Sequence, residues 1–412
     1  MKNQKLFSKD FTLVVIGQIV SLFGNATVRF ALPLYLLNHT GSSALYGAVT
    51  ACAFLPAILL SPVGGMVADR VNKRNIMVAL DFFTAAVILG FTLLMGGGHL
   101  ILLLTVTLML LYGIAGAYQP SVQASIPALV GQERFMEANS VINAVSSLAS
   151  LVGPVLGGML YSAYGLEPVL WVCMVCFVLS AVMEIFIRIP FQRQAWEGGV
   201  LRTVRADFAQ SARFIWKDRP VIGKALLAVC GINLFLSAMI VVALPYLVTE
   251  VLELETAQAN RLYGFAQGAL AAGGLAGGIG AGIFAKRLEV RKAGNLITAC
   301  AVSVFPIGAA LLSSSAMATY VVLTLCCFAV MVFSTMFSVQ MMSFIQTETP
   351  QNLIGKVIAV ILTVSMCAQP LGNAMYGVLF EVCDGIEYIP VFLSGAVSLA
   401  IALGAGKVFR RL

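Results

Sequence analysis

Long apolar stretches, separated by short polar connections, run through nearly the whole sequence and limit what it can fold into. Only 10% of the 412 residues are charged and 60% are hydrophobic, whereas soluble globular proteins carry roughly 25% charged residues. So few charges cannot cover the water-exposed surface of a chain of this length. Because a helix needs about 20 apolar residues to cross a bilayer, the sequence predicts an all-α membrane protein with about 12 transmembrane helices.

The first apolar stretch is too long for a signal peptide and lacks a small-residue cleavage site, so we interpret it as the first span. No stretch is left over for a soluble domain of ordinary size. The predicted spans cover residues 11–37, 44–68, 76–95, 100–122, 138–164, 169–188, 222–249, 261–285, 293–313, 317–345, 354–380 and 388–408.

Basic residues are almost confined to one side of this predicted topology. The tails and loops on the side of both termini contain 23 of the 25 lysines and arginines. Positive residues collect in cytoplasmic loops, so we expect a bacterial cytoplasmic membrane with both termini inside. The loops predicted on the opposite side carry Glu250, Glu253, Glu255, Glu381, Asp384 and Glu387.

The longest polar stretch divides the chain into two six-helix halves, predicted at 1–188 and 222–412. The linker at 189–221 has apolar residues at helical spacing, which predicts an amphipathic helix on the inner membrane surface. The halves also share features: Pro154 is echoed by Pro370, and Lys73-Arg74 by Lys286-Arg287. Such pseudo-symmetric halves are typical of transporters that bind substrate between them.

The loop after the second predicted span reads Gly64-Gly65-Met66-Val67-Ala68-Asp69-Arg70-Val71-Asn72-Lys73-Arg74. It resembles the signature G-x-x-x-D-[RK]-x-G-[RK]-[RK] of the major facilitator superfamily. The resemblance implies the major facilitator fold and a conformational latch formed by Gly65, Asp69, Arg70, Lys73 and Arg74. Asn72 replaces the usual glycine, and asparagine tolerates the left-handed backbone that we expect there.

The fifth predicted span contains Gly153, Pro154, Gly157 and Gly158. This resembles the antiporter motif G-P-x-x-G-G of exporters, although Ser140 and Ala149 stand where upstream glycines are typical. Small residues let helices approach closely, and proline permits a bend.

Two further segments, Tyr118-Gln119-Pro120 with Ile126–Val130 and Ala31–Tyr35, resemble the macrolide-efflux and siderophore-export branch of the superfamily. The arginine that many proton-coupled exporters carry near positions 113–116 is missing, which puts coupling through that arginine in doubt.

Arg29 lies inside the first predicted span, where an ionisable group normally faces a cavity or a partner. Gln18, Ser21, Asn25 and Arg29 form one polar stripe at helical spacing. We expect this stripe to line a substrate cavity; a structural ion pair is the alternative for Arg29. Similar stripes, which could equally bind helices together, contribute Asn143, Ser146, Asn233, Gln369 and Asn373.

Asp81 and Glu184 are the carboxyl groups within predicted spans. We consider both as possible proton carriers; pairing with arginines of the loops is the alternative.

These features predict a secondary transporter that exports small amphipathic compounds of the drug or macrolide type, by alternating access and proton antiport. Export of an anionic metabolite or siderophore is the alternative, and a non-transporting membrane sensor is an alternative of another class. We expect no enzymatic activity, because neither a convergent catalytic set nor the phosphate loop G-x-x-x-x-G-K-[ST] is present. We further expect a monomer with no cofactor, no metal and no nucleic-acid partner; Cys173 and Cys176 are interpreted as apolar helix residues.

Overall fold

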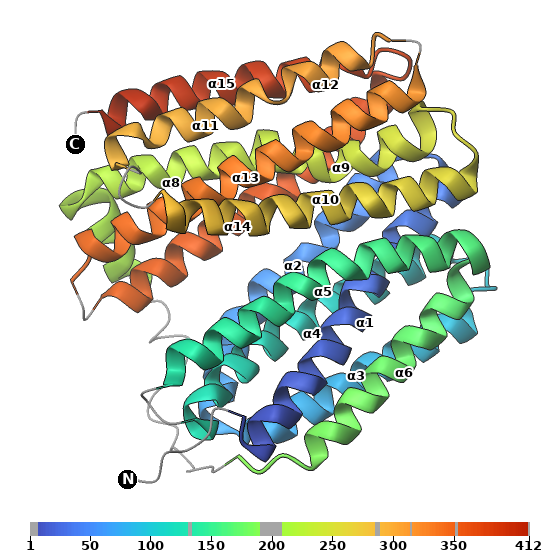
Figure 1. Cartoon of the computed structure of the whole chain (residues 1–412), viewed down its shortest axis with the longest axis vertical. Helices are drawn as coiled ribbons and strands as arrows, with labels where there is room; N and C mark the ends of the chain where they lie inside the picture. Colours follow the sequence, from blue (N-terminus) through green and yellow to red (C-terminus); the bar gives the residue numbers. More distant parts are fainter. Residues whose placement is uncertain are drawn as a thin grey trace. The chain divides into compact units, whose positions relative to one another are not determined.

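The computed structural model describes residues 7–130, 134–189, 208–284, 289–313, 315–350 and 353–410. Within these ranges the chain is made of helices and short connections and contains no strand (Figure 1). This confirms the predicted all-α class.

Six helices make up the first half of the chain: α1 (Lys9–Thr40), α2 (Ser43–Arg70), α3 (Lys73–Leu94), α4 (Leu100–Leu129), α5 (Phe135–Tyr164) and α6 (Leu166–Ile185). The second half contains η2 (Phe214–Asp218), α8 (Pro220–Ile232), η3 (Asn233–Ser237), α9 (Ala238–Tyr246), η4 (Leu247–Val251), α10 (Thr256–Ile283), η5 (Val290–Lys292), α11 (Ala293–Val302), α12 (Phe305–Ala310), α13 (Ala316–Glu348), α14 (Ile354–Val382) and α15 (Tyr388–Phe409).

Eleven of the described segments are long and apolar enough to cross a membrane. They include the continuous helical stretches Pro220–Val251 and Val290–Ala310, each of which combines several of the elements above. Helix α10 has 28 residues and lies where another span was predicted, but it is not among the eleven. The prediction of a multi-span membrane protein is therefore confirmed, whereas the count of twelve stays a prediction.

Local capping residues determine where several helices begin and end. The Ser8 hydroxyl accepts a hydrogen bond from the Phe11 amide at the start of α1, and Gly41 ends this helix with a left-handed φ of 62°, as is common for C-terminal glycines. At the start of α3, the Asn72 carboxamide oxygen accepts from the Arg74 amide at 3.1 Å. Asn72 itself has a φ of −59°, so the left-handed conformation expected there is wrong: its side chain caps α3 instead.

The long helix between Pro220 and Val251 contains two π-helical turns: η3 interrupts it, and η4 forms its end. The first begins at Asn233, whose side chain donates to the backbone oxygen of Ser365 on α14 at 2.9 Å. A π-helical turn inserts one extra residue and turns the following side chains around the helix, and such turns are frequent at functional sites.

The helices form two compact units. The first consists of Met1–Gly41, Cys52–Ala195 and Glu255–Gly268, and the second of Ser42–Ala51, Trp196–Leu254 and Ala269–Leu412. In the first unit, α1 packs against α4, α5 and α6, and α3 packs against α4 and α6. In the second, α11 packs against α13 and α15, while α14 packs along α8, η3 and α9.

The beginnings of α2 and α10 each group with the unit that contains the other half of the chain. The start of α2 packs on α14: Ser43 donates to the backbone oxygen of Gly377 at 2.9 Å, and Glu381 accepts from the Ser42 hydroxyl and the Ala44 amide. A methyl group added at Gly47 would come within 2.8 Å of the Gly377 Cα. We call this contact the α2–α14 junction.

The start of α10 packs on α5 in the same manner. Ser162 donates to the backbone oxygen of Ala257 at 2.6 Å, and a Cβ added at Gly158 would lie 3.0 Å from the Cα of Gly264. In addition, the Asn38 amide of α1 donates to Asn260 at 2.8 Å. This second contact, the α5–α10 junction, shows the close approach that small residues permit between membrane helices.

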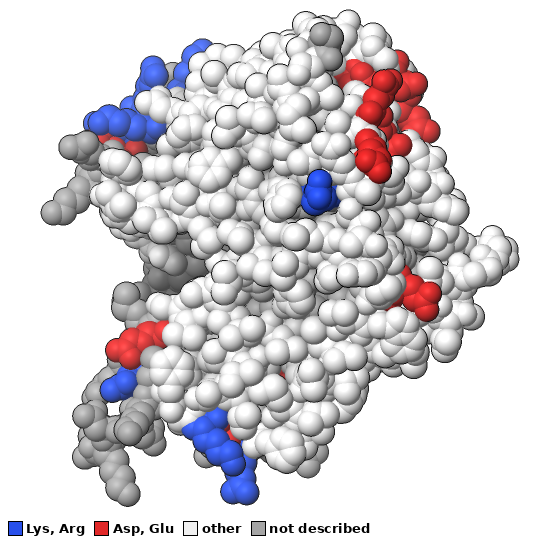
Figure 2. Space-filling model, turned by 45° about the vertical axis from the view of Figure 1, so that its right-hand side comes forward, with Lys and Arg blue, Asp and Glu red and all other residues white. Residues whose placement is uncertain are grey.

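Charged groups of the second unit are segregated to the helix ends (Figure 2). Glu250, Glu253, Glu381, Asp384 and Glu387 lie at the end of η4, the end of α14 and the start of α15. Lysines and arginines lie at the opposite helix ends, at the start of α8 and α14 and the end of α15. The predicted amphipathic helix of the linker falls largely on residues 190–207, outside the described ranges, although residues 208–213 are helical.

Candidate functional site: a polar cavity in the first unit

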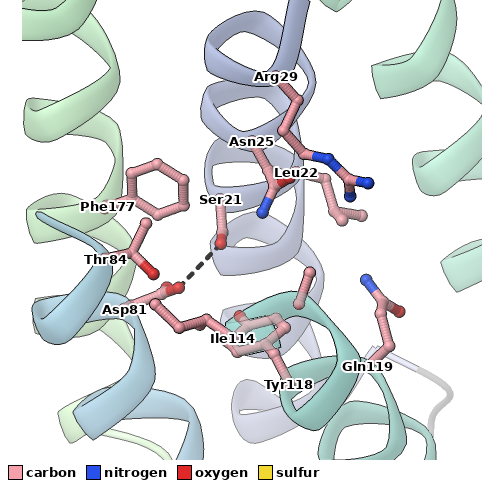
Figure 3. A pocket seen from close by; sticks show the side chains of 11 residues that line it. Ser21, Leu22, Asn25, Arg29, Asp81, Thr84, Ile114, Tyr118, Gln119 and Phe177 are labelled. Carbon is pink, nitrogen blue, oxygen red and sulfur yellow. Dashed lines mark hydrogen bonds between the residues drawn. The ribbon is translucent and has the colours of Figure 1, made fainter. Parts of the chain in front are cut away.

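A small cavity lies inside the first unit, between α1, α3, α4 and α6 (Figure 3). Its volume is about 80 Å³, and Ser21, Asn25 and Arg29 of the α1 stripe line it, together with Leu22, Asp81, Thr84, Ile114, Ala115, Tyr118, Gln119 and Phe177. Ligand pockets for drug-sized molecules measure roughly 300–1,000 Å³. The cavity therefore has room for water molecules or a small group, but not for a whole drug.

Asp81 of α3 faces this cavity although only 2% of its surface is exposed. The Ser21 hydroxyl of α1 donates a hydrogen bond of 3.0 Å to Asp81 Oδ1, which Figure 3 shows as a dashed line. The second carboxyl oxygen, Oδ2, has no hydrogen-bond partner among the described residues.

Glu184 of α6 is fully buried and lies behind the wall of the cavity. Its Oε1 accepts a 2.7 Å hydrogen bond from the Tyr118 hydroxyl, which in turn accepts one of 2.7 Å from the Gln18 amide. Tyr118 lines the cavity. The hydrogen-bond partners of Asp81 and Glu184 are thus hydroxyl groups of α1 and α4, not basic residues.

Neither carboxyl group forms an ion pair with any residue whose side chain the structure describes. An ionised carboxylate that is buried without a counter-charge is costly. The alternative considered from sequence, that loop arginines pair with these groups, therefore has no support in the described part of the chain. A proton bound to either group would remove one buried negative charge.

Arg29 is fixed by an aromatic side chain. The central carbon of its guanidinium group lies 3.4 Å from the centre of the Tyr112 ring, which packs edge-on against Phe54. Such cation–π contacts contribute about 0.5–1 kcal/mol at exposed sites and about 2 kcal/mol when desolvated. In Figure 3 the Arg29 side chain extends away from Asp81. The guanidinium is therefore held in place without using its hydrogen-bonding edge on a described carboxylate.

The glycines of the antiporter-like motif bring α5 onto α1. A Cβ added at Gly153 would meet Ala26, and one at Gly157 would lie 3.3 Å from Thr27. The Thr27 hydroxyl also donates to the Gly153 carbonyl at 3.4 Å. Pro154 lies inside α5, and Gly158 belongs to the α5–α10 junction. The motif thus supports the helix that carries the polar stripe, since Thr27 and Ala26 lie between Asn25 and Arg29.

Of the other predicted cavity residues, two belong to α5 of the first unit and three belong to the second unit. Asn143 is exposed and Ser146 partly buried on α5. Asn233 binds α14, as described above. Gln369 is partly buried, and Asn373 is fully buried with neither side-chain atom bonded to a described residue. The structure therefore brings Gln18, Ser21, Asn25 and Arg29 together with both carboxyl groups, while Asn143 and Ser146 are not among the residues that line the cavity.

The side chains of Gly65, Asp69 and Arg70 of the predicted latch are outside the described residues, although their backbone continues helix α2. Lys73 and Arg74 begin α3. The latch role of these five residues remains a prediction.

Sequence reasoning gave no site role to Tyr118, Tyr112 or Ser180. Tyr118 was noted only within a resembling segment, yet it lines the cavity and its hydroxyl is hydrogen-bonded to Glu184. The Ser180 hydroxyl donates to the Gly17 carbonyl and ties α6 to α1 at the level of Gln18. The sequence did contain a signal for Tyr118, because a tyrosine hydroxyl inside an apolar span needs a polar partner.

A bundle of membrane-length helices in two units, one of which contains a buried polar cavity, has the architecture of a membrane transporter. The family model of the Major Facilitator Superfamily matches residues 14–373, and the chain belongs to this superfamily. It is a transporter and not an enzyme, as the sequence predicted.

Similar proteins agree with this assignment. Macrolide efflux protein A of Streptococcus pyogenes is 25% identical over 98% of this chain and 96% of its own length. The multidrug efflux pump Tap of Mycolicibacterium fortuitum is 23% identical over 94% of each chain. Among solved structures, a bacterial homologue of the iron transporter ferroportin in an inward-facing state shares the fold with a TM-score of 0.73 and 19% identity over 99% of both chains.

Proposed function

We propose that this protein is a proton-coupled antiporter that exports amphipathic, drug-like compounds across a bacterial cytoplasmic membrane. Two independent observations support this proposal. Relatives named for macrolide and multidrug efflux align over nearly their whole length. The first unit holds two buried carboxyl groups that lack described basic partners.

The coupling mechanism is supported by two positions: Asp81 lines the cavity, and Glu184 accepts a hydrogen bond from Tyr118, which also lines it. A proton entering the cavity neutralises a buried carboxylate and removes its electrostatic cost. Release of that proton restores the charge and favours a conformation in which water reaches the site. When the proton binds in one conformation and the substrate in the other, each cycle carries a proton inward and a substrate outward. This is antiport by alternating access.

The size of the cavity separates the two tasks. At about 80 Å³ it accommodates water and protons, so a compound of drug size must make most of its contacts elsewhere. We assign to Arg29 and Asn25 the contact with substrate, because both lie at the end of the stripe away from Glu184. Our candidates for further substrate contacts are Asn143 and Ser146 in the first unit and Asn233, Gln369 and Asn373 in the second.

The test is cellular accumulation of labelled erythromycin and of ethidium, a cationic dye, in cells with and without the protein. We expect lower accumulation when the protein is present, and a protonophore should abolish the difference. The Glu184→Gln variant, expressed to the same level, should behave like cells that lack the protein. Unchanged accumulation of both compounds would contradict the drug-export assignment.

Export of an anionic metabolite or siderophore is a second candidate, and the Arg29 guanidinium favours it. This cation is immobilised on Tyr112 with no described carboxylate partner, so it suits a carboxylate or phosphate group of a substrate. Competition experiments distinguish the two candidates. Inhibition by anionic compounds, lost in Arg29→Ala, would favour the anionic substrate; inhibition by cationic compounds alone would contradict it.

We also propose that both termini are cytoplasmic, on the basis of the basic residues on that side of the topology. Fusions of a fluorescent protein or alkaline phosphatase to the C-terminus test this orientation, since the first is fluorescent in the cytoplasm and the second is active outside it.

A further inference from the structure

Glu184 has no direct access to the cavity. It is fully buried, and the residues that line the cavity include Asp81 and Tyr118 but not Glu184. Its Oε1 is bonded to Tyr118, and its Oε2 has no partner among the described residues. Among the described residues, Tyr118 is the cavity-lining residue that is hydrogen-bonded to Glu184 and thus links the two directly.

The position of Tyr118 suits this passage. Its ring forms part of the cavity wall, while its hydroxyl donates to Glu184 and accepts from Gln18, both at 2.7 Å. Glu184 and Gln18 fix the direction of the hydroxyl, because a phenol has one hydrogen to donate. The groups that face it are Gln18 and Ser21 of α1, Asp81 of α3 and Glu184 of α6; Arg29 is the cation of the same cavity.

We propose that Tyr118 is a proton relay: it is the group through which Glu184 exchanges its proton with water in the cavity. This inference rests on the proposed role of Glu184 as a proton carrier and names the route by which that carrier is loaded. Asp81, which lines the cavity itself, needs no such relay.

The transfer can be written with all protons accounted for. A hydronium ion in the cavity gives a proton to the Tyr118 oxygen. The original O–H bond of Tyr118 breaks, and its proton passes to Glu184 Oε1. Water remains in the cavity, Tyr118 is again a neutral phenol, and the carboxylate has become a carboxylic acid. Unloading follows the same steps in reverse.

Infrared spectroscopy of the purified full-length protein in lipid vesicles tests the relay without any transport substrate. The C=O stretch of a protonated carboxyl group reports each carrier, and the variants Glu184→Gln and Asp81→Asn assign the two bands. After a rapid change of external pH, we compare the rates at which the two bands respond.

Two substitutions at position 118 should have opposite effects. Tyr118→Phe keeps the ring and removes the relay, so the Glu184 response should slow by about 100-fold, the contribution typical of a positioned proton-transfer group. The Asp81 response should keep its wild-type rate and serves as the internal control for folding. Tyr118→Ala removes the wall itself, so water reaches Glu184 and its response should stay as fast as in the wild type.

A merely structural role of Tyr118 predicts the reverse order, with the alanine variant more impaired than the phenylalanine variant. A Glu184 response in Tyr118→Phe as fast as in the wild type would overturn the relay alone. If Tyr118→Phe did not fold, a slowed Glu184 response in Tyr118→Ala would still overturn it. Absence of any Glu184 response in the wild type would overturn both the relay and the proposed proton carrier, whatever the drug assays show.

Discussion

In the first unit, the buried polar groups include two carboxyl groups, Asp81 within α3 and Glu184 in the last turn of α6. In the second unit, they are almost all hydroxyls and amides, such as those of Asn373 and Gln340. Its one buried carboxyl group, within the described residues, is that of Glu387, which lies at the start of α15 and accepts from the Gly385 amide. The two units thus share a helical architecture but differ in how many carboxyl groups they bury and in where those groups lie.

The difference indicates a division of tasks. A buried group that can gain or lose a charge changes the energy of its surroundings by several kcal/mol, whereas amides and hydroxyls cannot. We therefore propose that ion coupling takes place in the first unit, whereas the buried polar groups of the second unit provide mainly neutral hydrogen bonds. Four sets of substitutions test this division, ordered from the largest expected effect to the smallest.

Glu184→Gln should abolish gradient-driven export, because a carboxamide cannot carry the proton. Export down a substrate gradient in proteoliposomes should persist, since it needs no coupling. The matched control is Glu387→Gln, which changes the buried carboxyl group of the second unit and should leave uphill export of erythromycin close to the wild-type rate. Loss of uphill export in the control and its retention in Glu184→Gln would reverse the assignment.

Valine at the glycines of the two junctions should destabilise both units alike. Gly47→Val would place side-chain carbons against Gly377, and Gly158→Val would place them against Gly264. Overpacking of this kind costs about 1–3 kcal/mol. Thermal unfolding of the detergent-solubilised variants measures the effect, with Gly282→Val as control because no atom lies within 4 Å of its added Cβ. A destabilisation confined to one junction would show that the two contacts are not equivalent.

Arg29→Ala should weaken binding of an anionic competitor about tenfold, from the loss of a charge-assisted contact of about 1.5 kcal/mol. Arg29→Lys keeps the charge but loses the planar group that stacks on Tyr112, and it should recover only part of this affinity. Competition against erythromycin or ethidium uptake in inverted vesicles provides the measurement. Equal affinities in all three proteins would exclude Arg29 from the substrate site.

Asn233→Ala should have the smallest effect, a destabilisation of about 0.6 kcal/mol, the average for hydrogen bonds between membrane helices. It removes the bond to the Ser365 carbonyl that accompanies the π-helical turn. The control is Asn143→Ala, whose side chain is exposed and should leave the melting temperature unchanged. A larger loss of stability in Asn143→Ala than in Asn233→Ala would contradict this interpretation.

Much of the fold could be predicted from the sequence, because a bilayer requires a run of apolar residues for each crossing and allows little else. The polar stripe of α1 could be predicted for the same reason: Ser21, Asn25 and Arg29 recur at helical spacing in an apolar helix. Their periodicity gives the face of one helix, but it does not tell which helices that face meets.

The hydrogen-bond partners of the two carboxyl groups could not be predicted. Glu184 and Tyr118 are 66 residues apart and Asp81 and Ser21 are 60 apart, so only the packing of α1, α3, α4 and α6 brings them together. Asn72 shows the opposite error. We expected a left-handed residue because the family pattern has glycine there, but an asparagine has a second option, since its side chain can cap the next helix.

The grouping of the first residues of α2 and α10 with the opposite half of the chain has a consequence for biosynthesis. A ribosome completes α2 long before it reaches Gly377 and Glu381, and α1 and α5 long before Asn260 and Gly264. Gly158 therefore lacks its contact until Gly264 has been made, and Gly47 lacks its contact with Gly377 until translation is nearly finished. If the two halves were made as separate polypeptides, each should be short-lived alone and both should be rescued by coexpression.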